Sequence, residues 1–270
     1  NAPGAMSGGD GARLAGRHVR GAHASLRVRT GGTGEPALLF LHSLAGSGRQ
    51  WTDVAEALAP SRRVVVLDLA GHGRSGAPAD GRYSLERAAE DVVRVLDALA
   101  LRRVVLVGHS FGGGVAALVA AERPAGTAGL FLLDAIGDGV RGGAEMRAFL
   151  RRLRQGSARE ALRAYWRLIL EGARPDTERL VLEDFEATSV EVILSCLAST
   201  AAFDGKATLA ACPGPMRALV TPLNAHPTSL HRVVPELPAE EIEGASHWVQ
   251  MDRPDAVTGA LERLLEEVGR

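Results

Sequence analysis

Cysteine and lysine are scarce in this chain of 270 residues, which has two cysteines and a single lysine, Lys206. Cys196 and Cys212 have neither the spacing of a metal-binding motif nor the number needed for a disulfide framework. We interpret them as two packed thiols in a reducing cytoplasm. The near absence of lysine beside abundant arginine and alanine hints at a bacterial genome rich in G and C, which bears on source and not on function.

The chain also lacks an excess of either charge and lacks long apolar runs. A net charge of −1 gives no electrostatic footprint for nucleic acid or for an anionic membrane. The basic run 151–154 is interpreted as a solvated helix face. No stretch of eighteen apolar residues occurs, so we expect no membrane-spanning segment. Residues 1–10 lack the apolar centre of a signal peptide, and residues 1–5 resemble a tag remnant before Met6.

Apolar strand-like runs alternate with helical patterns over the first half of the chain. The runs lack a polar face, which predicts a parallel sheet covered by helices on both sides. A looser alternation at residues 17–30 predicts an antiparallel edge hairpin. The buried strands are expected at residues 37–41, 63–68, 104–107 and 129–134.

The pattern changes at about residue 137, where charged amphipathic helices replace the strands. We expect these helices at residues 145–153, 158–170, 177–187 and 190–202. Strands return at 215–220 and 240–243, before a closing helix at 254–268. The predicted organisation is a flexible N-terminus (1–16), a core (17–136 and 213–270) and a helical cap or lid (137–212).

Ser110 lies in the sequence Gly108-His109-Ser110-Phe111-Gly112, between a predicted strand and an apolar helix. A side chain at the tip of so sharp a strand-to-helix turn needs a strained backbone, and the flanking glycines leave room for it. Because the strand and the helix are both present, we predict a nucleophile elbow with Ser110 as the nucleophile.

A serine hydroxyl is a weak nucleophile until a base accepts its proton. Of the eight histidines, His247 is the best candidate for the base. It follows a short strand late in the chain, and small residues beside it allow its loop to approach the elbow.

Four motifs, taken together and in order, resemble the α/β-hydrolase family over residues 17 to 268. The resemblance implies an eight-stranded, mostly parallel sheet with a helical cap inserted after the sixth strand. The motifs are His42-Ser43-Leu44, Asp68 with Gly71-His72-Gly73-Arg74-Ser75, Gly108-His109-Ser110-Phe111-Gly112-Gly113, and Gly244-Ala245-Ser246-His247 with Pro254.

The resemblance also implies an oxyanion hole made by two backbone N–H groups. One belongs to Phe111, which follows the nucleophile, and the other to Leu44 in the loop after the third strand. Ser43 departs from the glycine that is usual after His42. Its hydroxymethyl group either tunes the hole or caps the next helix, and we favour the cap.

The acid that orients the base is the main departure from the family. Most relatives carry an aspartate just after the strand at residues 216–220, where this chain has no carboxylate between Thr221 and Pro227. Some haloalkane dehalogenases of this fold place their acid at the end of the preceding strand, where this chain has Asp134. We therefore predict Asp134 as the acid, with Asp138 as the alternative. Asn224 as a neutral partner, or no acid at all, stays open.

Ser110 also restricts the chemistry. Dehalogenases and epoxide hydrolases of this fold attack an alkyl carbon with a carboxylate, whereas a serine attacks a carbonyl carbon. We therefore expect a serine hydrolase of the carboxylesterase type, acting on a small to medium, mostly apolar ester, thioester or lactone. Ser43, Trp166 and Trp248 are expected to line its pocket.

Two other functions stay open at this point. The same three residues can serve a carbon–carbon bond hydrolase, a lyase or a perhydrolase, and the fold does not separate these activities. The missing acid after residue 220 also suits a ligand-binding protein without hydrolytic activity. No cofactor is expected, because the chain has neither a metal-ligand cluster nor a dinucleotide fingerprint.

Overall fold

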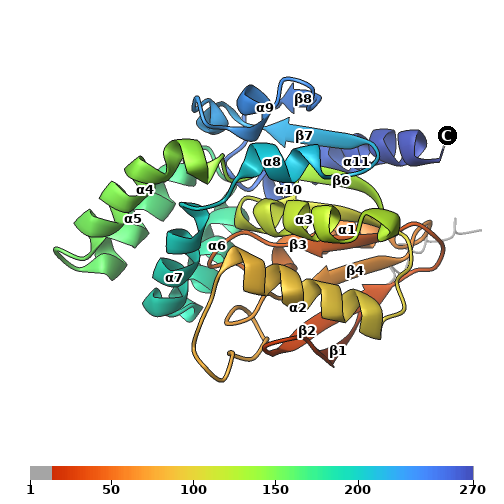
Figure 1. Ribbon diagram of the computed structural model, residues 1–270, viewed down its shortest axis with the longest axis horizontal. Coiled ribbons are helices and arrows are strands. Elements are labelled where there is room, and N and C mark those ends of the chain that lie inside the picture. The colour runs from red at the N-terminus through yellow and green to blue at the C-terminus, as the bar shows by residue number, and fades with distance from the viewer. Residues whose placement is uncertain (1–13, 270) are drawn as a thin grey trace, which may run out of the picture.

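A single sheet of eight strands organises the computed structural model, which describes residues 14–269 (Figure 1). The strand order is β1-β2-β4-β3-β5-β6-β7-β8, in which β1 and β2 are antiparallel to their neighbours and the other pairs are parallel. The expected α/β-hydrolase fold with a mostly parallel sheet is therefore confirmed. The strands are β1 (Ala15–Arg20), β2 (Ser25–Gly31), β3 (Ala37–Leu41), β4 (Val64–Leu67), β5 (Val104–His109), β6 (Thr127–Leu133), β7 (Met216–Val220) and β8 (Ala239–Glu241).

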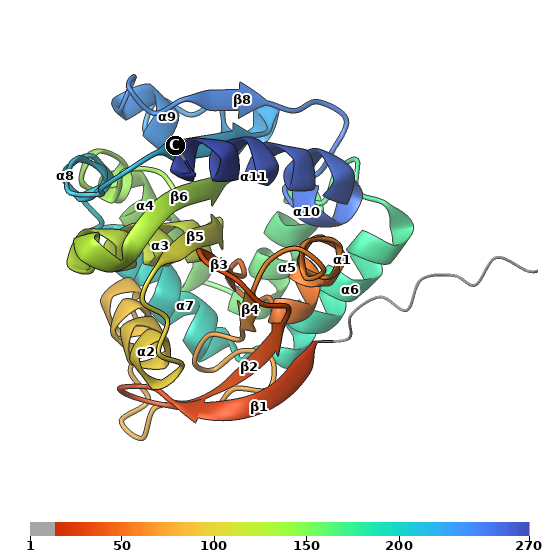
Figure 2. The ribbon, with the colours of Figure 1, turned by 90° about the vertical axis from the view of Figure 1, so that its right-hand side faces the viewer.

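The central strands are apolar along their whole length because helices cover both faces of the sheet. In β3, Leu39 packs into one core, while Leu38 and Phe40 pack into the other, as the alternation of side chains along a strand requires. Figure 2 shows α2 (Leu85–Ala98) and α3 (Phe111–Glu122) on one side of the sheet, and α11 (Pro254–Val268) on the other. Helix α1 (Thr52–Leu58) packs with α11 in the second core.

Five helices lie between β6 and β7, the interval in which the sequence predicts a helical insertion. In Figure 1, α4 and α5 extend beyond the end of the sheet toward which the arrow of β7 points. The carboxyl ends of the parallel strands therefore face the inserted helices, as is usual for ligand sites of open α/β sheets. The inserted helices are α4 (Gly139–Leu153), α5 (Ala158–Ile169), α6 (Pro175–Ala187), α7 (Val190–Thr200) and α8 (Gly205–Ala210).

The element boundaries differ from the expected ones in a few places. Helix α4 begins at Gly139, six residues before the predicted start, and α8 was not expected. The last strand, β8, is Ala239–Glu241 and so ends before residue 243. Short helices α9 (Leu230–Val233) and α10 (Val249–Asp252) also lack a periodic signal, since each has a single turn.

At the amino end, β1 begins at Ala15, two residues before the predicted hairpin. The predicted tag remnant at residues 1–5, and Met6, lie outside the described residues. Between residues 14 and 269, no helix is both long enough and apolar enough to cross a membrane.

Candidate active site

The turn between β5 and α3 holds Ser110 in a strained conformation. Its φ of 53° and ψ of −116° lie in a region that non-glycine residues rarely adopt. A Cβ atom on Gly108 would lie 2.3 Å from the Gly112 carbonyl oxygen, and one on Gly112 would lie 2.5 Å from the His42 carbonyl oxygen. Both glycines are therefore required by close backbone approach, and the Ser110 N–H is fixed by the Leu133 carbonyl at 2.9 Å.

His247 lies in the loop between β8 and α10. The preceding residue, Ser246, donates its backbone N–H and its hydroxyl to Asp252 Oδ2, at 2.9 and 2.6 Å. The backbone N–H of His247 itself donates to the Ile169 carbonyl of α5, at 3.2 Å. The loop of the predicted base is therefore anchored to α10 and to the inserted helices.

Asp134 follows β6 and forms the carboxylate partner of His247. His247 Nδ1 lies 2.8 Å from Asp134 Oδ2, and the Asp134 side chain is only 1% exposed. Thr221 donates its backbone N–H to Asp134 Oδ1 and its hydroxyl to Oδ2, each at 2.7 Å. An ionised carboxylate can only accept, so Nδ1 carries the proton of the neutral imidazole and Nε2 is left as the acceptor.

The two other candidates for the acid position have different partners. Asp138 caps α4, accepting the backbone N–H groups of Arg141 and Lys206 at 2.9 and 3.0 Å, and it forms an ion pair with the Arg141 guanidinium. The Asn224 amide donates to the Ala135 carbonyl at 3.1 Å. The structure therefore brings Asp134 to His247 and directs the other two side chains elsewhere.

Ser110 and His247 line the same cavity, which has a volume of about 510 Å³. Within residues 14–269, the hydrogen bonds of His247 include none to the Ser110 hydroxyl. Such contacts are often long without substrate and tighten in the reacting complex. The two side chains therefore line one cavity without a direct hydrogen bond between them among residues 14–269.

The backbone of the predicted oxyanion loop is fixed on the side of the core. His42 Nε2 accepts the backbone N–H of Leu69 at 2.9 Å, so its Nδ1 carries the proton and donates to the Ser43 carbonyl at 2.7 Å. Burial lowers the pKa of His42, which keeps the ring neutral in this role. Leu44 and Phe111 both line the cavity beside Ser110.

The walls of the cavity are mostly apolar and come from α4, α5 and the loops of the sheet. The predicted pocket residues Ser43, Trp166 and Trp248 all belong to this lining. Tyr165 lines it as well, and burial, followed by the negative charge of Asp134, raises the pKa of its hydroxyl. The remaining apolar side chains of the lining include Ile136, Met146, Phe149, Ile169, Leu197 and Leu223. Polar side chains of the lining include Glu145, Arg152 and His226.

His109 packs directly beneath the predicted base. Its ring centroid lies 4.6 Å from that of His247, and its Nδ1 lies 3.0 Å from the Gln250 amide nitrogen. Burial lowers the pKa of His109 well below its ordinary value, and the neighbouring His247 lowers it further. A neutral ring here avoids a second positive charge beside His247 if His247 serves as the predicted base.

Sequence reasoning missed the side chains that support this site, namely Thr221, Asp252 and Gln250. Thr221 had one available signal, because it follows β7 directly and β7 pairs with β6, which ends beside Asp134. Among residues 14–269, no group of three or more His, Cys, Asp or Glu side chains has the arrangement of a metal site.

A sequence profile described as alpha/beta hydrolase fold matches residues 36–201. Among curated relatives, a putative non-heme haloperoxidase of Mycobacterium phage D29 is 40% identical over 109 residues, which cover 40% of this chain and 38% of that protein. A 2-hydroxymuconate semialdehyde hydrolase of Pseudomonas sp. strain CF600 is 36% identical over 126 residues, covering 45% of this chain and 44% of the relative. The chain therefore spans less than half the length of these two relatives.

Two further similarities extend over most of the chain. An sn-1-specific diacylglycerol lipase of Mus musculus is 28% identical over 262 residues, covering 84% of this chain and 81% of the lipase. The solved structure of Est816, described as an N-acyl homoserine lactone degrading enzyme, has a TM-score of 0.79 and 26% identity, covering 92% of this chain and 99% of the other. An Exiguobacterium antarcticum esterase has a TM-score of 0.80 at 18% identity, covering 93% of this chain and 100% of the esterase, and shows the fold alone.

Proposed function

This chain belongs to the α/β-hydrolase fold family, and on that premise we propose that it is a serine hydrolase with Ser110, His247 and Asp134 as its catalytic residues. The proposed substrates are small to medium, mostly apolar carboxylic esters, or related thioesters and lactones. One observation carries the proposal. The His247–Asp134 pair, joined at 2.8 Å, lines the same cavity as a serine held in a strained elbow.

The first chemical step is acylation of Ser110. His247 Nε2 accepts the hydroxyl proton as Ser110 Oγ attacks the carbonyl carbon, and the carbonyl electron pair moves to its oxygen. The carboxylate of Asp134 stabilises the imidazolium that forms and holds it in the required orientation. Three hydrogen bonds, two from Thr221 and one from His247, keep that carboxylate in place.

The negative oxygen of the tetrahedral intermediate is stabilised by the backbone N–H groups of Phe111 and Leu44. Phe111 is the first residue of α3, so the helix dipole also favours negative charge at this point. One such donor contributes roughly 10²–10³-fold in kcat in a well-studied serine protease.

Collapse of the intermediate breaks the ester bond, and His247 gives its proton to the leaving alcohol. A water molecule then attacks the acyl-enzyme with His247 as base, and Ser110 and the acid product are released. We propose that the inserted helices form a lid over this reaction, since α4 and α5 contribute Met146, Phe149, Tyr165, Trp166 and Ile169 to the cavity wall.

A cavity of about 510 Å³ suits a small or medium substrate, and its apolar walls favour an apolar acyl or alcohol group. The second candidate function is hydrolysis of a carbon–carbon bond beside a carbonyl. It is favoured by the similarity to the 2-hydroxymuconate semialdehyde hydrolase and uses the same three residues. Glu145, Arg152 and His226 in the lining would suit the more polar substrates of such a reaction.

The proposal is tested by the change Ser110→Ala, assayed on p-nitrophenyl esters of graded acyl length. We expect a loss of kcat on the order of 10⁶-fold, as seen when a triad that acts as a unit loses its nucleophile. A fluorophosphonate probe should label the unaltered protein and not the variant. Ester turnover that survives the change undiminished would rule out Ser110 as the nucleophile, whereas labelling without ester turnover would favour the carbon–carbon hydrolase.

A further inference from the structure

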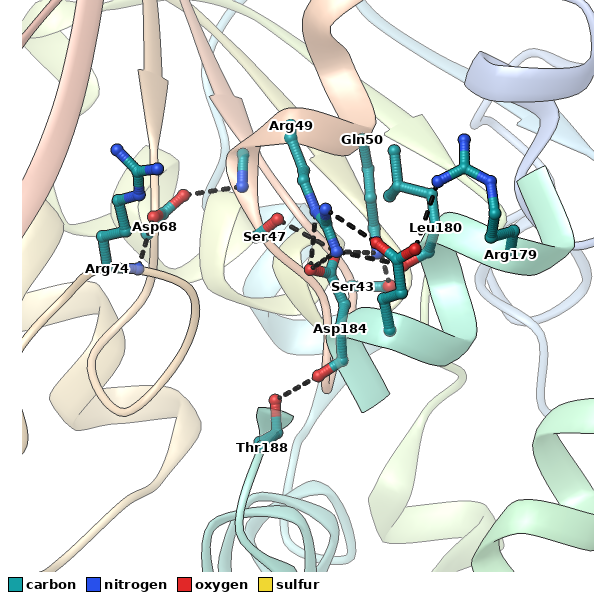
Figure 3. A network of polar contacts seen from close by, with 12 residues as sticks. Ser43, Ser47, Arg49, Gln50, Asp68, Arg74, Arg179, Leu180, Asp184 and Thr188 are labelled. Carbon is teal, nitrogen blue, oxygen red and sulfur yellow. Dashed lines mark hydrogen bonds and ion pairs between the residues drawn. The ribbon is translucent and has the colours of Figure 1, made fainter. Parts of the chain in front are cut away.

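A buried carboxylate of the inserted helices forms hydrogen bonds to the loop that follows β3. Asp184 of α6 is 6% exposed and accepts three hydrogen bonds from this loop, as Figure 3 shows. Its donors are the Ser47 hydroxyl at 2.9 Å, Arg49 Nε at 2.8 Å and the Gln50 amide at 3.0 Å. A buried carboxylate is costly unless it is paired in this way, so the three donors fix the loop against α6.

Gln50 connects Asp184 to Ser43, which lies next to the predicted oxyanion hole. Its amide nitrogen donates to Asp184, which leaves its Oε1 to accept the hydroxyl of Ser43 at 3.3 Å. Ser43 and Gln50 are both 2% exposed. A Cβ atom on Gly46 would lie 2.6 Å from Gln50 Oε1, so the amide also packs against the backbone of the same loop. The chain of contacts from Asp184 thus ends one residue before Leu44.

The core holds the same loop from its other side. Asp68 accepts the backbone N–H of Gly48 at 2.7 Å and that of Arg74 at 2.9 Å (Figure 3). Core contacts therefore fix Gly48 and the Ser43 carbonyl, while Asp184 fixes the side chains of the loop.

We propose that Asp184 is a positioning residue that sets the geometry of the Leu44 oxyanion donor through Gln50 and Ser43. This inference rests on the proposed serine hydrolase function. Because Asp184 belongs to α6, the inserted helices that line the substrate cavity would also determine how well the enzyme stabilises the negative oxygen of the intermediate. The Ser43 hydroxyl donates to Gln50, and Ser47 stands at the N-cap position of the next helical turn, so the helix-capping role expected for Ser43 from the sequence is wrong. Ser43 instead belongs to the support of the loop.

The test compares Asp184→Asn with Glu183→Gln. Glu183 is the neighbouring acid on α6 and pairs with the same arginine, Arg49, but it is exposed and does not contact Ser47 or Gln50. Asparagine keeps the shape of Asp184, removes its charge and turns one acceptor into a donor facing other donors. We expect Asp184→Asn to lower kcat about 10- to 100-fold with little change in KM, because misplacing a group by about 1 Å costs a similar factor. Glu183→Gln should leave both constants unchanged.

The inhibition constant of a trifluoromethyl ketone separates the two roles. It should stay unchanged if Asp184 only stabilises the fold, and it should rise in Asp184→Asn if Asp184 positions the oxyanion donor. Ser110 adds to its carbonyl and forms a tetrahedral adduct whose negative oxygen occupies the oxyanion hole. Asp184→Asn should weaken this inhibitor by the same factor as kcat, with rates expressed per site titrated by a fluorophosphonate. An unchanged kcat per titrated site and an unchanged inhibition constant would overturn the proposal, even if less of the protein folds.

A second variant and a second measurement cover the remaining outcomes. Gln50→Met cuts the link to Ser43 but leaves the Asp184–Arg49 ion pair, so it should fold and should lower kcat in the same direction. Amide hydrogen exchange of residues 42–51 should be faster in Asp184→Asn than in Glu183→Gln, independently of any substrate. If the unaltered protein cleaves no ester and takes no label, the proposed function fails, while equal exchange in the two variants would overturn the positioning role on its own.

Discussion

The two sides of Ser110 are held by different parts of the chain. On the side of the proposed acid, called the acid side, Asp134 follows β6 and its carboxylate accepts two hydrogen bonds from Thr221, which follows the neighbouring strand β7. On the side of the proposed oxyanion hole, called the oxyanion side, the loop after β3 is held by Asp68 of the core and by Asp184 of the inserted helix α6. The first arrangement follows from the register of the sheet, and the second depends on the contact between the insertion and the core.

The two sides of the site should differ in how easily their geometry changes. A sheet register is rigid, since a slip of one residue would turn every side chain to the other face. A helix packed on a loop can shift by smaller amounts when its own sequence or its ligand changes. We therefore expect the oxyanion side to be the adjustable half of the site. The His247 backbone, which donates to Ile169 of α5, gives the insertion a second contact with the proposed catalytic residues.

The largest effect that tests this comparison is expected for Asp134→Asn. The variant keeps the shape of the side chain but no longer stabilises the imidazolium or its tautomer, and the same change in a serine protease lowers kcat about 10⁴-fold. Asp138→Asn is the matched control. It weakens a helix cap and an ion pair, so it should cost about 1 kcal/mol in the free energy of unfolding. Its kcat should stay close to that of the unaltered protein.

Steady-state kinetics and urea unfolding of both variants make this measurement. A large loss of kcat in Asp138→Asn, with Asp134→Asn still active, would reverse the assignment of the acid. It would also mean that the register of β6 and β7, which places Asp134 beside Thr221, does not determine the position of the catalytic acid.

On the acid side the sequence predicts the strand ends well, although it leaves the choice among Asp134, Asp138 and Asn224 open. Strand ends are marked by apolar runs that stop at polar residues, so Asp134 and the position of Thr221 can be placed from the sequence alone. Neighbouring parallel strands then bring such ends together. The expected fold is confirmed for the same reason. The catalytic roles of Ser110, His247 and Asp134 remain a proposal that this geometry supports.

The insertion is less predictable because its contacts are set by tertiary packing. The first five residues of α4 include Gly139, Gly142 and Gly143, which have poor helix propensity, so a helix start at residue 145 was expected. A Cβ atom on Gly139 would lie 1.8 Å from the Thr200 carbonyl oxygen, so close packing against the end of α7 requires glycine there. Asp184 likewise has the sequence pattern of a solvated helix face, and only the packed structure shows it to be buried.

A smaller effect is expected for Thr221→Val, which tests whether the acid side depends on the sheet alone. The variant keeps the backbone N–H that donates to Asp134 Oδ1 but removes the hydroxyl that donates to Oδ2. A hydrogen bond to a charged group contributes roughly 1.5–3 kcal/mol, so we expect a fall in kcat of about 10- to 150-fold. Thr228→Val is a suitable control, since its hydroxyl bonds to His226 at the rim of the site. Equal kcat values in the two variants would show that the backbone contact is sufficient.

The smallest effect at neutral pH is expected for His72→Gln, which affects stability on the oxyanion side rather than turnover. His72 packs against His42, with ring centroids 5.2 Å apart, and its Nδ1 bonds to the Ala70 carbonyl. Burial, followed by the proximity of His42, lowers the pKa of His72 to about 3, so the folded protein keeps this ring neutral. The unfolded chain takes up a proton near the ordinary histidine pKa of about 6.5. Between these two pKa values the unfolded state binds more protons, so the free energy of unfolding falls as the pH falls, by up to about 1.4 kcal/mol per pH unit for this one group.

Replacing His72 by glutamine removes that proton uptake. Urea unfolding at pH 7 and at pH 5 should therefore show a shallower loss of stability in His72→Gln than in the unaltered protein or in the exposed control His18→Gln. An identical slope in all three proteins would mean that His72 does not contribute to the acid sensitivity of the fold.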